Sequence, residues 1–223
     1  MRKRNVILSI FLASIFTACV SDDDEEEKWN AAEVCPESKR GTFTDERDGQ
    51  VYKYTTIGNQ VWMAENLKYD AEYSVCLEKF DKYENFCNQY GRFYSLQKNE
   101  KYRENLDENL VSGVCPAGWH VPSLEEWKTM IEMMGGFSQQ SSALRLKSGN
   151  EWANGTGENA CGFSAKPAGV YVNEEEGVHF ARYDAVFWTS TKEDSQDYYT
   201  IKIEKDVTVF NHFPKMTIRC LKD

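Results

Sequence analysis

The clearest hydrophobic pattern of the chain lies between Val114 and Phe137. Pro122 disfavours helical backbone in the residue before it, so a helix is expected to begin just after this proline. Ser123 suits the N-cap position, and Glu126 can complete a capping box. Apolar residues then recur at helical spacing on one face: Trp127, Met130, Ile131 and Met134. Gly135-Gly136 is expected to end the helix, and we predict that this block is the nucleus of the core.

A second pattern, alternation of polar and apolar residues, predicts strands on both sides of this helix. Residues 41–69 alternate like a hairpin, with one turn at Asp45–Gly49 and another at Gly58-Asn59. The first turn is not an EF-hand loop, because aligning its glycine puts Thr44 first and Thr55 twelfth. Further strands are predicted near the C-terminus, where they are expected to complete one sheet: 198–204, 207–210 and 216–221.

Three polar segments separate these elements. Residues 97–109 are highly charged and are expected to form a surface insertion or a short helix. Residues 149–162 are rich in Gly and Asn around Trp152 and are expected to form a loop. The acidic run Glu174–Glu176 indicates a solvated turn rather than a metal site.

The N-terminus has the features of an export signal. Arg2, Lys3 and Arg4 precede a short, mostly apolar run, and Ala18 directly precedes Cys19. The run is too short for a stable transmembrane helix. The segment resembles a bacterial lipobox, which implies that residues 1–18 are a signal peptide and that Cys19 carries the lipid. An ordinary secretory signal with a core cysteine beside the cleavage site is the alternative.

The segment after Cys19 is strongly acidic. Residues 22–27 are six consecutive Asp and Glu residues, which cannot be buried and are expected to form a solvated tether within residues 19–40. The block also resembles the acidic export signals of surface lipoproteins in the Bacteroidetes, which implies an outer-membrane, cell-surface location. Loss of Arg2, Lys3 and Arg4 with the leader would change the net charge from −10 to −13. Such a surface repels phosphate backbones and argues against a nucleic-acid partner.

The cysteine count agrees with this interpretation. The chain has seven cysteines, and lipidation of Cys19 leaves an even number for disulfides in an exported protein. Six cysteines allow fifteen pairings. We predict Cys76–Cys87, because the loop between them is short, and Cys115–Cys220, which would tie the central block to the last strand. Cys35–Cys161 then remains by elimination.

A family resemblance rests on several segments that occur in order: DERDGQVYKYTTIGNQVWMAENLKY (45–69), YGRFYSL (90–96), CPAGWHVPSLEEW (115–127), GFSAKPAGV (162–170), FWTST (187–191) and IRCLKD (218–223). Together they resemble the Fibrobacter succinogenes major paralogous domain, here expected over residues 41–223. The GWHVPSLEEW block also resembles a block of the formylglycine-generating enzyme superfamily. That second resemblance implies an α+β, C-type-lectin-like fold with a small twisted antiparallel sheet, two helices, long loops and disulfide staples.

The residues argue against the enzymatic chemistry of that superfamily. Its copper-binding cysteine pair near the C-terminus has only Cys220 as a counterpart, and Cys161 lies far upstream. Trp188–Thr191 replaces the Arg-Gly-Gly-Ser signature. Glu125 and Glu126 are adjacent on a helix and are not a ready acid/base pair. His120 is expected to be a packed or hydrogen-bonded structural histidine. We therefore expect no catalytic residue, no cofactor and no metal ion.

The remaining hypothesis is binding. Calcium-lectin motifs are absent from the sequence, so candidate ligand contacts rest on aromatic and amide side chains in the predicted loops: Trp152, Asn154, His179, Tyr183 and Trp188. The neighbouring Asn and Gly residues predict that Trp152 is exposed, whereas Trp188 next to Phe187 can equally be core. We expect a non-catalytic recognition or adhesion module that binds a polysaccharide or another surface protein. A structural envelope protein and, less favoured, a formylglycine-generating oxidase are the alternatives.

Overall fold

The computed structural model describes residues 29–80, 83–95, 111, 113–193, 198–210 and 215–223. Its described helices are α1 (Ala31–Val34), the 3-10 helix η1 (Glu37–Lys39), α2 (Phe86–Tyr90), α4 (Leu124–Met133) and α5 (Gln140–Leu146). Its described strands before α4 are β1 (Gly41–Thr44), β2 (Val51–Ile57), β3 (Gln60–Met63), β4 (Ser74–Val75), β5 (Lys79–Phe80), β6 (Tyr83–Glu84), β7 (Phe93–Tyr94) and β8 (Trp119–His120). After α5 come β9 (Val170–Tyr171), β10 (Val178–His179), β11 (Ala185–Lys192), β12 (Tyr198–Ile203), β13 (Val207–Phe210) and β14 (Leu221–Lys222).

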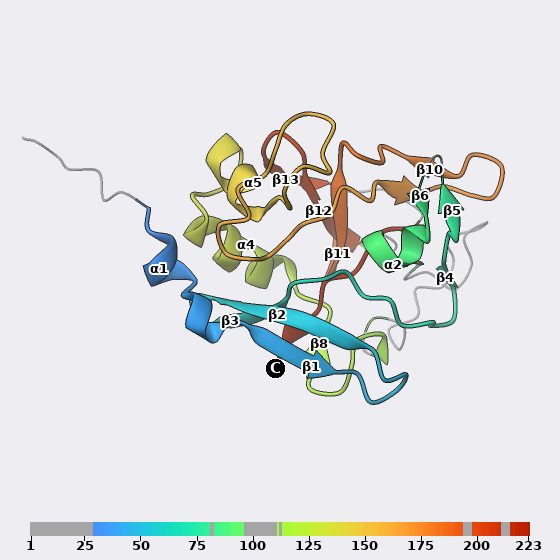
Figure 1. Ribbon diagram of the computed structural model, residues 1–223, viewed down its shortest axis with the longest axis horizontal. Coiled ribbons are helices and arrows are strands. Elements are labelled where there is room, and N and C mark those ends of the chain that lie inside the picture. The colour runs from blue at the N-terminus through green and yellow to red at the C-terminus, as the bar shows by residue number, and fades with distance from the viewer. Residues whose placement is uncertain (1–28, 81–82, 96–110, 112, 194–197, 211–214) are drawn as a thin grey trace, which may run out of the picture.

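A five-stranded antiparallel sheet joins the two ends of the described chain. Its strand order is β1-β2-β3-β14-β8, so the last strand lies between the N-terminal hairpin and the strand that precedes α4. Figure 1 shows β1, β2 and β3 together along the lower edge of the molecule, with β8 and the C-terminus beside them. The hairpin turns fall where the sequence predicts them, after Thr44 and at Gly58-Asn59.

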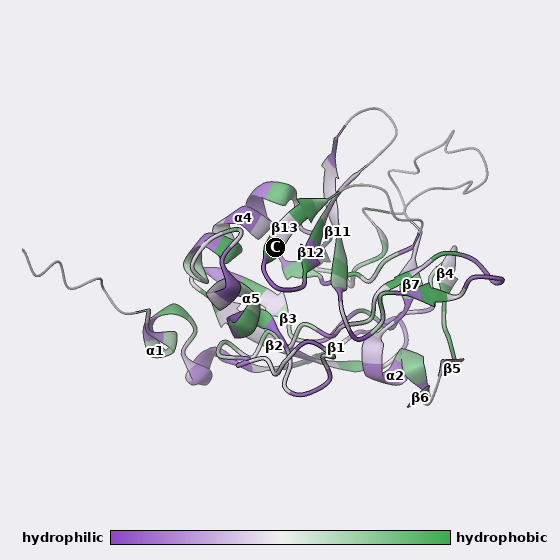
Figure 2. Cartoon of the chain, turned by 90° about the horizontal axis from the view of Figure 1, so that it is seen from above, coloured by the Kyte–Doolittle hydropathy of each residue, from purple (hydrophilic) through white to green (hydrophobic). Residues whose placement is uncertain are grey.

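A three-stranded antiparallel sheet, β11-β12-β13, forms the centre of the core with the helices. Helix α4 packs on β11 and β12, and α5 packs on β13. Trp127 of α4 is fully buried, and its ring lies 4.6 Å from the Trp62 ring and 5.4 Å from the Phe187 ring, measured between centroids. Figure 2 shows hydrophobic residues on β11 and β12, in agreement with their buried faces. The block around α4 is thus part of the core, as predicted.

The ends of α4 follow the sequence closely. The Ser123 side chain accepts a hydrogen bond from the Glu126 backbone N–H, and the Glu126 carboxylate accepts one from the Ser123 backbone, which completes the predicted capping box. At the other end, Gly135 and Gly136 adopt φ values of 116° and 91°. These left-handed conformations suit glycine and end the helix where the sequence predicts.

Three disulfides link distant parts of the described chain: Cys35–Cys161, Cys76–Cys87 and Cys115–Cys220. They are the three predicted pairs. The first joins the segment after α1 to the loop before Phe163, and the third joins the approach to β8 to the residue before β14. The second closes the segment that contains the small β5–β6 hairpin.

Ordered packing begins before residue 41. The Trp29 indole N–H donates to the Met133 carbonyl at 2.7 Å, and the Arg145 guanidinium lies 4.1 Å above the Trp29 ring. The backbone N–H of Gly58 donates to the Val34 carbonyl. Residues 29–40, which the sequence places in the tether, therefore lie against the domain. The predicted signal peptide, Cys19, the acidic block and residues 97–109 lie outside the described residues.

One strand prediction is wrong in detail. The sequence places residues 216–221 in the same sheet as 198–204 and 207–210. Instead, Thr217 makes a single bridge with Phe187 of β11, and the chain then moves to the five-stranded sheet, where Leu221 pairs with Trp62 and His120. The fold is mixed α+β, with several small antiparallel sheets and few helices, and no helix of the described chain is long and apolar enough to cross a membrane.

Candidate binding groove on the five-stranded sheet

The register of the five-stranded sheet brings distant residues to one face. Thr56 pairs with Val61, and Lys222 pairs with Trp119. Side chains opposite each other in an antiparallel sheet point to the same face. With Phe43, Tyr54 and Lys39, these residues line a shallow groove of about 310 Å³, which we call the sheet groove.

Aromatic rings form much of the sheet groove. The Phe43 ring stacks on the Trp119 ring, with 4.3 Å between centroids, so the two strands at opposite edges of the sheet meet across this face. Trp119 is almost buried, whereas Phe43 and Tyr54 are partly exposed. The groove therefore offers apolar ring surface that a ligand can cover.

Tyr54 depends on the glycine opposite it. Gly41 of β1 pairs directly with Tyr54 of β2, and a Cβ added to Gly41 would lie 2.6 Å from the Tyr54 hydroxyl. The tyrosine ring thus lies over Gly41, and a larger side chain at position 41 would push the ring away. This arrangement fixes the ring at the edge of the groove.

Two lysines give the groove its charge. Lys39 and Lys222 are both exposed, and neither forms an ion pair with any residue that the structure describes. Lys39 belongs to η1, whose position on β2 is held by a 2.9 Å hydrogen bond from the Thr56 hydroxyl to the Lys39 carbonyl. Lys222 comes from β14. No carboxylate is among the described residues that line the groove.

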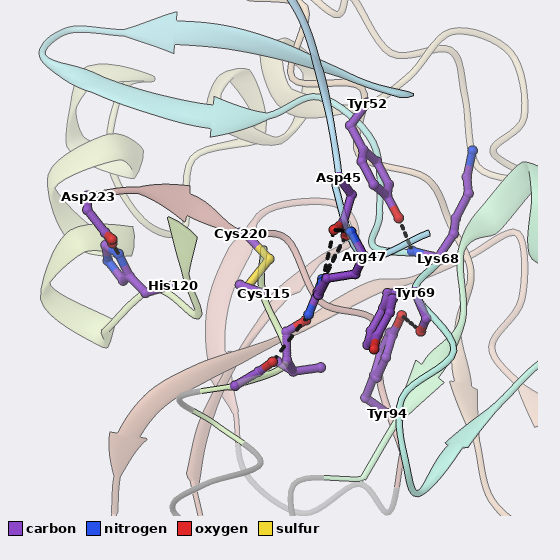
Figure 3. Close-up of a disulfide and its surroundings, with 12 residues drawn as sticks. Asp45, Arg47, Tyr52, Lys68, Tyr69, Tyr94, Cys115, His120, Cys220 and Asp223 are labelled. Atoms are coloured by element: carbon purple, nitrogen blue, oxygen red, sulfur yellow. Dashed lines mark hydrogen bonds and ion pairs between the residues drawn. A yellow bond between two sulfur atoms is a disulfide. The ribbon is translucent and has the colours of Figure 1, made fainter. Parts of the chain in front are cut away.

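A second cleft of about 360 Å³ shares Phe43 with the sheet groove and lies at the turn after β1. In this cleft the cationic residue, Arg47, already forms an ion pair within the protein. The Arg47 guanidinium donates to both carboxylate oxygens of buried Asp45 and to the Val114 carbonyl at 2.9 Å, and it lies 3.7 Å above the Tyr69 ring. Figure 3 shows this pair beside the Cys115–Cys220 disulfide. These contacts indicate a structural role for Arg47.

Electrostatics supports that role. Burial acts to raise the pKa of Asp45, but the hydrogen bonds and the charge of Arg47 outweigh it, so the pKa lies below its ordinary value. Burial acts to lower the pKa of Arg47, but the hydrogen bonds with Asp45 and its charge outweigh burial, so the pKa lies above its ordinary value. Both groups are therefore charged, and the pair fixes the approach to β8.

His120 lies between two carboxylates at the end of the sheet. Its Nδ1 is 2.6 Å from Oδ1 of Asp223, and its Nε2 is 3.0 Å from Oε1 of Glu126, the capping residue of α4. Burial acts to lower the pKa of His120, but the hydrogen bonds to Asp223 and Glu126 raise it above its ordinary value. The prediction that His120 is a hydrogen-bonded histidine is confirmed. Asp223 and His120 appear together in Figure 3.

The prediction that Trp152 is exposed is wrong. Only 4% of its surface is accessible, and the ring belongs to the main core cluster. The ammonium group of Lys147 lies 4.2 Å from the ring centroid and covers it. Burial lowers the pKa of Lys147. The Gly- and Asn-rich segment is a loop, as expected, but the loop folds its tryptophan inward.

Of the other candidate contacts, Asn154 lies near Trp152 because Lys147 contacts both, and the Ala153 backbone N–H donates to the carbonyl of Arg182, beside Tyr183. Trp188 is 3% exposed, and its indole N–H donates to the Tyr94 carbonyl at 2.8 Å, which makes it a core residue. His179 on β10 is partly exposed and Tyr183, which follows β10, is exposed. The His179 Nε2 is 3.5 Å from a carboxylate oxygen of Glu176. Asn154 is exposed and accepts a 3.4 Å bond from Lys147. Of the three candidate Trp and Tyr rings, that of Tyr183 is the most exposed.

The acidic run Glu174–Glu176 forms a turn. The Asn173 side chain accepts hydrogen bonds from the backbone N–H groups of Glu175 and Glu176. Among the described residues, no group of three or more His, Cys, Asp or Glu side chains is arranged to hold a metal ion.

The residues of the sheet groove are not predicted by the sequence, because strand pairing brings them together from residue 39 to residue 222. One local signal is present. Tyr52, Tyr54 and Thr56 alternate on one face of β2, and only Tyr52 of the three is buried. Tyr54, an aromatic residue at a solvent-facing position of a predicted strand, is the one local feature that indicates a binding surface here.

The geometry defines a small disulfide-linked α+β domain with an open aromatic groove. The family model for the Fibrobacter succinogenes major domain matches residues 55–222, and the chain belongs to this family. No curated protein matches the chain significantly, and no solved structure does so either. The match begins within β2 and includes most of the strands that form the groove.

Proposed function

We propose that the chain is a surface-anchored lipoprotein that acts as a non-catalytic recognition module for carbohydrate, with the sheet groove as its binding surface. The observation that carries the proposal is the partly exposed aromatic surface of Phe43 and Tyr54 on an open face of the sheet. Sugar rings have apolar faces that pack on aromatic rings, and the hydroxyl groups at their rims remain in water. A shallow groove suits such a ligand better than a deep, enclosed pocket would.

The cysteines support a non-catalytic role. Cys220 is bonded to Cys115, and Cys161 is bonded to Cys35. Neither cysteine is a free thiol that could act as a copper ligand in formylglycine chemistry. The Glu126 carboxylate is also engaged, since it caps α4 and contacts His120.

The test is a saccharide-binding screen with the full-length protein purified from membranes in mild detergent. A glycan array and plant polysaccharides provide the probes, and isothermal titration measures the affinity of any hit. Tyr54→Ala is expected to weaken binding at least tenfold. Tyr183→Ala removes the same ring from an exposed position outside the groove, and it should leave binding unchanged.

Two further variants separate loss of the site from loss of the fold. Tyr54→Phe keeps the ring and should retain binding. Gly41→Ala crowds the Tyr54 hydroxyl and should weaken binding by moving the ring. Loss of binding in Tyr183→Ala, with full binding in Tyr54→Ala, would move the site to the loop after β10. Absence of binding to every saccharide would overturn the proposal.

A second candidate function is docking of a protein partner at the loop after β10. Phe180 and Tyr183 are 52% and 53% exposed, and Phe180 and Arg182 have φ values of 59° and 71°. Bulky residues held in left-handed backbone are uncommon and occur preferentially at functional sites. Cross-linking from position 183 on whole cells would test this candidate.

A further inference from the structure

We propose that the sheet groove selects saccharides that carry carboxylate groups, such as chains of uronic acids. The inference rests on the proposed function, since it specifies the ligand class of the same groove. It is drawn from the charge of the groove, which differs in sign from that of the protein as a whole.

The first observation concerns the two lysines. The chain has a net charge of −10, and several of its lysines are paired with carboxylates, as in Lys68–Glu65, Lys128–Glu125 and Lys202–Glu204. Lys39 and Lys222 have no such partner among the described residues, although acidic residues are abundant. Their ammonium groups are therefore available to a ligand.

The second observation is the lining between the lysines. Phe43, Tyr54, Val61 and Trp119 supply the apolar surface, and Thr56 supplies a hydroxyl, whereas no acidic side chain is among the described lining residues. Unpaired surface lysines are common in proteins. Their position beside an aromatic surface without carboxylates is the feature that favours an anionic sugar.

The third observation concerns spacing. Lys39 contacts β2 through Thr56, and Lys222 belongs to β14, two strands further along the sheet. Neighbouring strands are about 4.8 Å apart, so the backbone of Thr56, which lies beside Lys39, is separated from that of Lys222 by roughly 10 Å. This separation suits an oligosaccharide with carboxylates on different sugar units better than a single small anion.

The expected contribution of the lysines is moderate. Ion pairs at exposed positions strengthen an interaction only a few-fold each, so the two lysines together should account for about a tenfold change in affinity. The acidic remainder of the surface repels the same ligand, but charges more than about 8–10 Å away are screened at physiological ionic strength. Binding should therefore depend on salt and on these two residues.

The experiment compares an oligogalacturonide with its fully methyl-esterified form, which has the same backbone without the charges. The full-length protein should bind the charged form at least tenfold more tightly at about 50 mM NaCl, and the difference should shrink at about 500 mM NaCl. Lys39→Gln/Lys222→Gln should remove the preference, so that the charged form and its ester bind with the same affinity.

A matched control removes the same charge elsewhere. Lys53 and Lys205 are exposed and do not line the groove, so Lys53→Gln/Lys205→Gln should keep the preference. Equal binding of the acid and the ester, or an equal effect of the two double variants, would overturn this inference and leave the proposed function intact. If neither form binds and no saccharide in the wider screen binds, the proposed function fails as well.

Discussion

Replacement of Arg219 tests how a buried cation without a carboxylate partner affects this fold. Arg219 is fully buried in the described chain and lies 4.5 Å from the centroid of the Phe163 ring. Its Nε and Nη2 donate to the Asn66 amide oxygen at 3.1 and 2.6 Å. The remaining donors reach the carbonyl oxygens of Met63, Phe163 and Ser164. Burial lowers the pKa of Arg219 to about 9, so the group is charged at neutral pH.

The expected change in the free energy of unfolding follows from these contacts. Arg219→Met fills a similar space but leaves four oxygen acceptors, three of them in buried contacts, without this donor. Each unsatisfied buried group costs about 1–3 kcal/mol. The change also removes the desolvation cost of the cation, which is several kcal/mol. We expect a net loss of about 2–4 kcal/mol in the free energy of unfolding. Arg219→Lys should lose a similar amount, because an ammonium group cannot reproduce the forked geometry.

Denaturant unfolding at pH 7 without reductant, followed by tryptophan fluorescence, measures these changes with the disulfides intact. Lys205→Met, an exposed control, should change the free energy of unfolding by less than about 0.5 kcal/mol. If Arg219→Met is as stable as the wild type or more stable, the desolvation cost of the cation exceeds the value of its five hydrogen bonds. That result would refute a net stabilising role for Arg219.

Three other predictions concern the core, the pH dependence and the anchor. Trp127→Ala should lower the free energy of unfolding by roughly 3–5 kcal/mol, measured by the same denaturation, because the ring is fully buried. His120 binds its proton more tightly in the folded state than in the unfolded state. Its contribution to the free energy of unfolding is therefore fully present below its ordinary pKa of 6.5 and is lost as the pH rises through the higher pKa of the folded state. The melting temperature of His120→Gln should therefore fall further below that of the wild type at pH 6 than at pH 8.5, and an equal difference at both values would contradict this assignment. Cys19→Ala should move the protein from the membrane fraction to the soluble fraction, and a mutant that still partitions with membranes would exclude lipidation as the anchor.

Local rules are sufficient for the features that depend on nearby residues. The capping box of Ser123 and Glu126, the glycine stop after α4 and the two hairpin turns all arise from contacts within a few positions. The disulfides are also predictable, because the six described cysteines leave few arrangements once a short loop is paired.

Features that depend on tertiary contacts are not predictable in this way. The composition around Trp152 indicates a loop but not the direction in which the loop folds, and Lys147 covers the ring only once the loop has packed back on the end of α5. An arginine in an alternating strand gives no sign that Arg219 is fully buried. The sheet groove escapes prediction for the same reason, since its lining residues meet only after β14 is inserted between β3 and β8.

The Cys35–Cys161 disulfide has a mechanical consequence. A force applied at the N-terminal end passes through Trp29 and α1 to Cys35, where it is transferred to the core through a covalent bond. Lys39 and Phe43 follow Cys35 closely in the chain, so a ligand held in the sheet groove would load only the short segment between the groove and this bond. Tension between the N-terminal end and a ligand on β1 would therefore pass mainly along residues 29–43, and the disulfide would keep this segment attached to the loop that contains Cys161. The domain could then resist shear without unfolding its core.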